Sequence, residues 1–126
     1  MKFNTLISEL EVSNIEASKK FYIDVLDFKL EYERKEDKFV FLSKDGSQLM
    51  LEETVDDELE YPYGRGVNLT FTVYGIERLY QKLQSEDYSV YKELTTRKFR
   101  VNDQYTTPKE FAVKDLDDYL LRFSEN

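Results

Sequence analysis

The second half of the chain weakly repeats the first half, and this internal repeat is the feature that most constrains the fold. Residues 7–24 read as a strand followed by a helix, and residues 68–85 read in the same way. Val12 and Val73 end the two predicted strands, at an offset of 61 residues (73 − 12). The pair Ile15-Glu16 recurs as Ile76-Glu77 at the same offset. A duplicated module is the simplest explanation, so we expect two similar units around one core.

Length and composition fit one small domain. The chain has 126 residues, of which 40% are hydrophobic, and a chain of this size buries roughly two thirds of its unfolded surface. Its apolar runs are too short to span a membrane, and its first residues lack the apolar stretch of a signal peptide. We therefore expect a cytoplasmic domain with no membrane partner.

The residue types exclude several kinds of chemistry. Cysteine and histidine are both absent, which removes disulfides, thiolate nucleophiles, imidazole bases and the usual ligands of zinc, iron, nickel and copper. The net charge is −8, from 18 basic and 26 acidic residues. Nucleic acid is an unfavourable partner for such a chain, because affinity for phosphates comes largely from lysine and arginine. A cationic ligand would be attracted by the same field.

Periodicity predicts a strand and then a helix at the start of the first module. Apolar residues alternate along residues 6–12, which is typical of a strand with one buried face. Ser13 and Glu16 have the spacing of a capping box, so we expect a helix that begins at Ile15. Asp27 follows the helix where a left-handed backbone is expected, a conformation that Asp tolerates.

The remaining elements follow the same order in both modules. Asp45-Gly46 is a strong hairpin signal, because a type I′ turn needs positive φ at both central residues. We expect module 1 at about 1–55, an acidic linker at about 56–66 and module 2 at about 67–126. The predicted strands of the first module are 29–34, 38–44 and 47–53; the second has a strand at 67–73, a helix at 76–85 and strands at 88–94, 109–114 and 119–124.

The second module contains an insertion. Its final hairpin turn at Asp117 lies 72 residues after Asp45 (117 − 45), so about 11 residues have been added to the earlier offset (72 − 61). The polar segment from Arg97 to Thr107 is the candidate; it contains the aromatic residues Phe99 and Tyr105 and three basic residues, Arg97, Lys98 and Arg100. A loop of this length in a compact domain is commonly a binding loop or a mobile one.

The order of these motifs resembles the vicinal oxygen chelate superfamily, the glyoxalase and bleomycin-resistance group. The resemblance covers nearly the whole chain and rests on Val12–Ser18, Phe21-Tyr22, Val25–Phe28, Glu110–Asp115 and Tyr119–Phe123. It implies an α+β fold in which paired βαβββ modules form a curved mixed sheet, shaped as a cup. Asp27, Leu116 and Asp118 replace the usual glycines and proline. These departures lie in turns, so they bear on turn geometry rather than on the fold.

The resemblance also implies where a metal would sit. In metal-dependent relatives the ligands lie on the first and last strands of each module, and the matching positions here are Ile7, Met50, Asn68 and Arg122. Ile7 has no donor atom, Met50 offers only a thioether and Arg122 carries a permanent positive charge. We therefore expect no metal, no cofactor and no catalytic residue at these positions.

Within the superfamily the chain resembles the metal-free bleomycin-resistance proteins, acidic homodimers that sequester a cationic, partly planar antibiotic. This predicts a homodimer with a small-molecule ligand, which could be a bleomycin-type antibiotic. No tryptophan is available for stacking, so other side chains would line the groove, with Phe39 the preferred stacking residue. The expected ligand-binding residues are Phe39, Phe41, Tyr61, Tyr63, Asn68, Tyr105 and Arg122.

Several alternatives stay open. Arg122 either pairs with a carboxylate of the protein or meets an anionic part of a ligand. The acidic run from Glu52 to Glu60 is either a solvated loop or an electrostatic guide for a cationic ligand. An oxygen-only magnesium or calcium site in this run, or around Asp115–Asp118, lacks EF-hand spacing.

Two other functions compete with sequestration. The first is a superfamily enzyme with a metal-independent reaction, in which Glu9, Glu110 or a tyrosine acts as general base. The second is a structural dimer whose groove holds another protein. Turnover would favour the enzyme, and a copurifying polypeptide would favour the structural dimer. A shared scaffold does not name the ligand.

Overall fold

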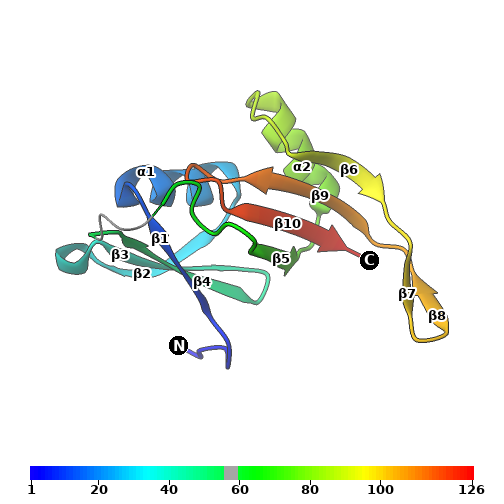
Figure 1. Cartoon of the computed structure of the whole chain (residues 1–126), viewed down its shortest axis with the longest axis horizontal. Coiled ribbons are helices and arrows are strands. Elements are labelled where there is room, and N and C mark those ends of the chain that lie inside the picture. The colour runs from blue at the N-terminus through cyan, green and yellow to red at the C-terminus, as the bar shows by residue number, and fades with distance from the viewer. Residues whose placement is uncertain (56–59) are drawn as a thin grey trace.

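The computed structural model describes residues 1–55 and 60–126 of the chain (Figure 1). The first module contains β1 (Ser8–Val12), α1 (Ile15–Lys20), a π-helical turn (Phe21–Val25), β2 (Lys29–Arg34), a 3-10 turn (Lys35–Asp37), β3 (Phe39–Lys44) and β4 (Ser47–Glu53). The second contains β5 (Asn68–Thr72), α2 (Ile76–Ser85), β6 (Lys92–Thr96), β7 (Phe99–Val101), β8 (Gln104–Thr106), β9 (Lys109–Lys114) and β10 (Leu120–Glu125). Neither helix of these described residues has the length and apolar character needed to cross a membrane.

Each module forms its own mixed sheet of four strands. The order is β1-β4-β3-β2 in the first sheet and β5-β10-β9-β6 in the second sheet. The outer pairs β1–β4 and β5–β10 are parallel, and the other neighbours are antiparallel. The prediction of an α+β fold built from paired βαβββ modules is therefore confirmed. In Figure 1 the two sheets lie beside one another, with one helix packed on each.

One face of each sheet packs into a shared core, and the opposite face is called the open face below. Leu10, Leu49 and Leu51 of the first sheet and Phe111 and Phe123 of the second belong to the core. The residues directly before and after each of them on a strand therefore lie on the open faces, because successive side chains of a strand point to opposite sides. Fully burying one large apolar side chain contributes about 1.5–3 kcal/mol, so the core side dominates folding.

Glutamates at equivalent positions of the two modules accept hydrogen bonds from the first residue of each helix. The backbone N–H of Ile15 donates to Glu53 Oε1 at 3.1 Å, and that of Ile76 donates to Glu125 Oε1 at 2.9 Å. Both pairs keep the repeat offsets, since 76 − 15 is 61 and 125 − 53 is 72. These hydrogen bonds lower the pKa of Glu125, and contribute to a lowered pKa for Glu53 after its bond to Lys38.

The predicted capping box of Ser13 and Glu16 is wrong. Asn14 is the N-cap of α1, and its side chain accepts a hydrogen bond from the N–H of Ala17 at 2.9 Å. The Ser13 N–H donates instead to Asp117 of the other module at 3.0 Å. A long-range partner has therefore taken the Ser13 amide, which the local motif was expected to satisfy.

A buried carboxylate joins the two modules. Asp115, only 4% exposed, accepts hydrogen bonds from the Tyr22 hydroxyl at 2.6 Å and from the N–H groups of Asp117 and Tyr119 at 2.9 Å. The Tyr119 hydroxyl in turn donates to the backbone oxygen of Glu11. Burial raises the pKa of Asp115, and the Tyr22 hydrogen bond opposes that rise.

The turn predictions are confirmed. Asp27 has φ 61°, while Asp45 and Gly46 have φ 48° and 91°. Two neighbouring positive values are what a type I′ hairpin requires. The first module therefore closes its β3–β4 hairpin with the residues that its sequence indicated.

Other boundaries differ from the predictions. Leu6 is 84% exposed rather than part of a buried strand face, and β1 begins at Ser8. The strand predicted at 88–94 begins only at Lys92. The N–H of Tyr88 instead donates a hydrogen bond to the backbone oxygen of Leu83 at the end of α2. Residues 97–107, expected to form a loop, contain the β7–β8 hairpin that extends away from the second sheet in Figure 1.

Replacing Tyr22 with phenylalanine should lower the free energy of unfolding by about 1–3 kcal/mol, the cost of an unsatisfied buried acceptor. A carboxyl group with a raised folded pKa contributes stability at low pH and loses it as the pH rises through that pKa. Removing the Tyr22 hydroxyl raises the pKa of Asp115 further. Urea unfolding should therefore show a larger loss at neutral pH than at a pH below the ordinary Asp pKa.

Tyr80→Phe is the matched control, because the Tyr80 hydroxyl has no hydrogen-bond partner among residues 1–55 and 60–126. It should change the unfolding free energy little at either pH. Equal losses for the Tyr22 and Tyr80 variants, or a Tyr22 loss independent of pH, would contradict the role given to Asp115.

Candidate functional site

Two rows of side chains cross the open face of the first sheet. Residues paired in register across neighbouring strands share a face, and β2, β3, β4 and β1 follow one another in this sheet. The rows are Tyr32, Phe41, Met50 and Glu9, and beside them Arg34, Phe39, Glu52 and Glu11. Each row therefore begins with an aromatic or cationic side chain at β2 and ends with a carboxylate at β1.

The aromatic end is a stack of rings outside the main core. Tyr32 and Phe41 are stacked with centroids 5.2 Å apart, and Phe39 lies 6.0 Å from Tyr32. Phe3 packs edge-on against Phe41 at 5.4 Å. Phe41 is 0% exposed and Phe39 is 4% exposed. A ligand could therefore touch Phe41 only if its covering side chains moved, which the sequence did not indicate.

Arg34 covers Phe39. The carbon of its guanidinium lies 4.0 Å from the centroid of the Phe39 ring, and its Nε donates to Asp37 at 2.8 Å. A planar cation over an aromatic face is attracted by the ring quadrupole. The predicted stacking surface thus already holds a planar cation that belongs to the chain itself.

At the other end of the rows, the carboxylates of Glu9, Glu11 and Glu52 lie close enough to affect one another. A hydrogen bond with Glu52 raises the pKa of Glu9, and burial and repulsion from Glu52 and Glu11 add to the rise. Within residues 1–55 and 60–126, none of these three carboxylates forms a salt bridge. A cation placed over β1 and β4 would relieve this repulsion.

Two other predicted residues meet at the second sheet. Tyr63 and Asn68 line one hollow of about 310 Å³, together with Tyr91, Lys114 and other residues of β10 and the linker. Tyr61 lies next to this hollow, 6.1 Å from Tyr63 by ring centroid. Its hydroxyl donates to Asp118 at 2.8 Å.

The remaining predicted residues lie apart from this group. Tyr105 is on the β7–β8 hairpin, 62% exposed, with Lys98 Nζ 4.4 Å from its ring centroid. Asp56, Asp57 and Glu58 of the acidic linker fall outside the described residues. The structure thus groups Phe39 with Phe41 and Tyr63 with Asn68, and it leaves Tyr105 elsewhere.

Of the four positions that the resemblance matches to metal ligands, Ile7 lies just before β1 and the other three divide between the two sheets. Met50 lies on the open face of the first sheet, whereas Asn68 and Arg122 belong to the second. Of these, only Asn68 offers an oxygen suited to a hard divalent metal. No group of three or more acidic, cysteine or histidine residues that could hold a metal occurs in the described ranges. The donor set therefore does not fit a metal centre.

For Arg122 two alternatives were open, an ion pair with a carboxylate of the protein and a contact with an anionic part of a ligand. No salt bridge or hydrogen bond joins Arg122 to any residue in the described parts of the chain. It is partly exposed and borders a small hollow that Lys92 and Glu110 also line. Of the two alternatives for Arg122, a contact with the protein's own carboxylate is therefore not made here.

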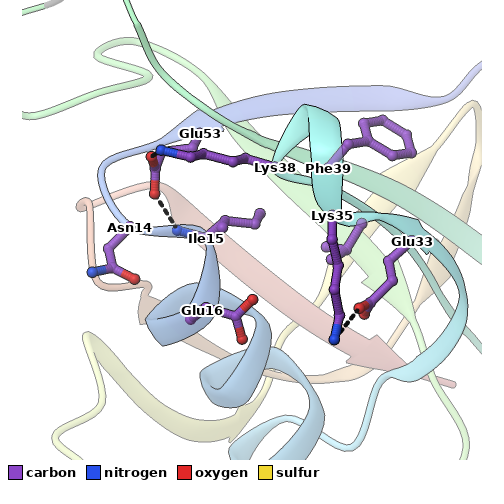
Figure 2. A pocket seen from close by; sticks show the side chains of 9 residues that line it. Asn14, Ile15, Glu16, Glu33, Lys35, Lys38, Phe39 and Glu53 are labelled. Carbon is purple, nitrogen blue, oxygen red and sulfur yellow. Dashed lines mark hydrogen bonds and ion pairs between the residues drawn. The ribbon is translucent and has the colours of Figure 1, made fainter.

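A separate cleft of about 380 Å³ opens between the first turn of α1 and the turn that joins β2 to β3 (Figure 2). Four of its five charged side chains already have ion-pair partners: Lys38 pairs with Glu53 at 2.8 Å, and Glu33 pairs with Lys19 at 2.7 Å and with Lys35 at 3.8 Å. The fifth, Glu16, has no such partner among residues 1–55 and 60–126. In Figure 2 the ring of Phe39 points away from Ile15. This cleft is less suited to a charged ligand than the open face of the first sheet.

Sequence reasoning missed four residues of the two rows on the open face. Tyr32, Arg34 and Glu11 were assigned only to strands, and Glu52 only to a strand and an acidic run. The signal was present in the alternation of β4, where Met50 and Glu52 alternate with the buried Leu49 and Leu51. The same parity places Glu9 on the open face.

Comparisons with known proteins identify the family. Residues 6–123 match the family described as the Glyoxalase/Bleomycin resistance protein/Dioxygenase superfamily. A superfamily member from Vibrio splendidus 12B01 shares 39% sequence identity, with 94% of this chain and 95% of that chain covered and a TM-score of 0.46. The chain belongs to the glyoxalase/bleomycin resistance/dioxygenase superfamily. No curated protein matches it.

More distant solved structures share the fold. A glyoxalase/bleomycin resistance protein/dioxygenase from Alicyclobacillus acidocaldarius is 20% identical, with a TM-score of 0.69 over 97% of this chain and 90% of that one. TioX from Micromonospora sp. ML1 is 13% identical, with a TM-score of 0.72 over 98% and 96%. At these identities the likeness concerns the fold alone.

Glu52→Gln should lower the pKa of Glu9 toward its ordinary value, because the change removes the carboxyl group that shares a hydrogen bond with Glu9 and also the charge that repels it. An NMR titration of the side-chain carboxyl carbons would measure this. Glu16→Gln, on α1, is the control and should leave the Glu9 titration unchanged. An unaltered Glu9 pKa in the Glu52 variant would mean that the two carboxylates do not interact.

Proposed function

We propose that this chain is a metal-free small-molecule-binding protein of the bleomycin-resistance type, which sequesters a cationic, partly aromatic ligand. The ligand lies on the open face of the first sheet, with its aromatic part toward β2 and β3 and its charge toward β1 and β4. The binding is non-catalytic, and it would confer resistance if the ligand is an antibiotic.

The observation that carries this proposal is that aromatic rings share one face with carboxylates that form no salt bridge to any described residue. Phe39 already accepts a planar cation at 4.0 Å, and Glu9 and Glu52 lie in the same two rows without a salt bridge to any described residue. A ligand cation that replaces Arg34 would keep the ring contact and gain the carboxylates. The net charge of −8 adds a long-range attraction for such a ligand.

A second copy of the chain completes the groove in this proposal. β1 and β2 are the outer strands of the first sheet, and β5 and β6 those of the second. Outer strands leave backbone groups available for pairing with another chain. A homodimer with twofold symmetry would cover such edges and enclose the open faces between its subunits.

One observation favours a second candidate function. The raised pKa of Glu9 is a property of many general acids and bases, so a metal-independent reaction at this face is the alternative. Saturable binding without turnover separates the two. Consumption of a bound ligand at a rate that Glu9→Gln abolishes would favour the enzyme.

Variants of the aromatic end test the sequestration directly. Phe39→Ala should weaken binding of a bleomycin-type glycopeptide several-fold, because a ring contact of this kind contributes about 0.5–1.5 kcal/mol beyond area burial. Arg34→Ala should strengthen it, since the change removes a competing cation. Calorimetric titration of both variants gives the two affinities, and Lys29→Ala at the exposed end of β2 is the control.

A matching test uses bacteria that are sensitive to such drugs. Expression of the wild-type chain should raise the tolerated drug concentration, and the Phe39 variant should raise it less. If neither calorimetry nor growth responds to any bleomycin-type drug, sequestration of this ligand class is contradicted, and only the family membership stands.

The dimer can be measured without a ligand. Light scattering at micromolar concentration should give twice the mass of the 15.1 kDa chain. A predominantly monomeric protein would contradict a groove completed between subunits.

A further inference from the structure

The open face of the second sheet carries the opposite charge. Its central row consists of Thr70 on β5, Arg122 on β10, Ala112 on β9 and Lys92 on β6. Thr70 and Arg122 correspond to Glu9 and Met50 at the repeat offsets, since 70 − 9 is 61 and 122 − 50 is 72. The row that is aromatic and acidic in the first module is therefore hydroxyl-bearing and basic in the second.

Ala112 separates two long cationic side chains. Arg122 and Lys92 both pair in register with Ala112, so their α-carbons lie about 10 Å apart across two strand spacings. Ala112 is only 4% exposed although its side chain is a single methyl group. Neither Lys92 nor Arg122 has a salt bridge or hydrogen bond within the described parts of the chain.

The next row supplies a buried acceptor. Glu110 pairs in register with Thr95 on one side and Ser124 on the other, and it is 8% exposed. Its Oε1 is buried and has no hydrogen-bond partner among residues 1–55 and 60–126. It lines a hollow of about 20 Å³ with Lys92 and Arg122, which is room for about one water-sized oxygen. A buried carboxylate oxygen of this kind calls for a donor.

We propose that this row is a binding site for a phosphate-type oxyanion that carries a proton, either free phosphate or the phosphate group of a larger ligand. Arg122 and Lys92 hold the anionic oxygens above Ala112. The protonated oxygen enters the hollow and donates its hydrogen to Glu110. The site lies on the second sheet and does not depend on what binds the first.

The charges around the hollow agree with this assignment. Its lining includes three basic residues, Lys92, Arg97 and Arg122, against two acidic residues, Glu93 and Glu110. A fully deprotonated anion would meet the repulsion of Glu110 without any compensating bond. An oxyanion that keeps a proton turns the same carboxylate into a partner, so Glu110 acts as a selectivity filter against sulfate.

Calorimetric titration of the full chain near pH 6.5 with inorganic phosphate and with sodium sulfate, at matched ionic strength, tests the proposal. Phosphate keeps at least one proton at this pH and sulfate keeps none, so the wild type should bind phosphate more tightly. Arg122→Gln and Lys92→Gln should each weaken phosphate binding about tenfold, which corresponds to one lost charge-assisted hydrogen bond. Glu110→Gln should abolish the preference for phosphate over sulfate.

Lys20→Gln, at an exposed position on α1, is the matched control and should bind phosphate like the wild type. Unchanged phosphate affinity in both the Arg122 and the Lys92 variants would overturn the site. Equal wild-type affinities for the two anions would overturn the role of Glu110. If these variants alter the mass seen by light scattering and not the phosphate affinity, the two cations pair with carboxylates of a second copy and the proposal fails. A phosphate-ester probe in a second titration distinguishes the free ion from a larger ligand.

Discussion

The two modules are joined through their core sides, and the buried carboxylate of Asp115 lies at that junction. It accepts hydrogen bonds from the Tyr22 hydroxyl of the first module and from two backbone N–H groups of its own module. Ring contacts across the same junction, such as Phe28 against Phe71 at 5.4 Å, add apolar contact area. Because the junction uses the core sides, both open faces stay outside it, and their residues are free to differ.

That freedom explains how a duplicated module can carry two chemistries. The parts that build the fold keep the repeat, as Glu53 and Glu125 do at the starts of the two helices. The rows on the open faces do not repeat the same residue types. Aromatic rings and carboxylates occupy the open face of the first sheet, whereas Arg122 and Lys92 flank Ala112 on that of the second. A ligand that contacts the open faces of both sheets would need a cationic aromatic part for the first sheet and an anionic group for the second.

Much of the fold could be predicted from the sequence, because its signals are local. The offsets of 61 and 72 identified the modules, and Asp45-Gly46 identified a hairpin whose residues have the required positive φ. The errors arose where distant residues replaced a local partner. Ser13 lost its capping role because Asp117, remote in sequence, accepts its amide hydrogen bond.

The site was less predictable than the fold, since burial on an open face depends on which side chains lie across it. Phe41 is fully buried because Phe3 and Tyr32 pack against it, and neither neighbour is indicated by strand periodicity. The carboxylates Glu9 and Glu52 were assigned separately, although the parity of β1 and β4 places them on one face. Pairing across strands, rather than order along the chain, brings these residues together.

An NMR titration of the isotope-labelled chain with a bleomycin-type glycopeptide tests the central claim most directly. The account predicts saturable changes in the amide signals of β1, β3 and β4 around Glu9, Phe39 and Glu52, with the signals of α2 unchanged. Changes confined to the cleft beside Lys38 and Glu53, or no saturable change at any ligand concentration, would contradict a cation-binding open face on the first sheet.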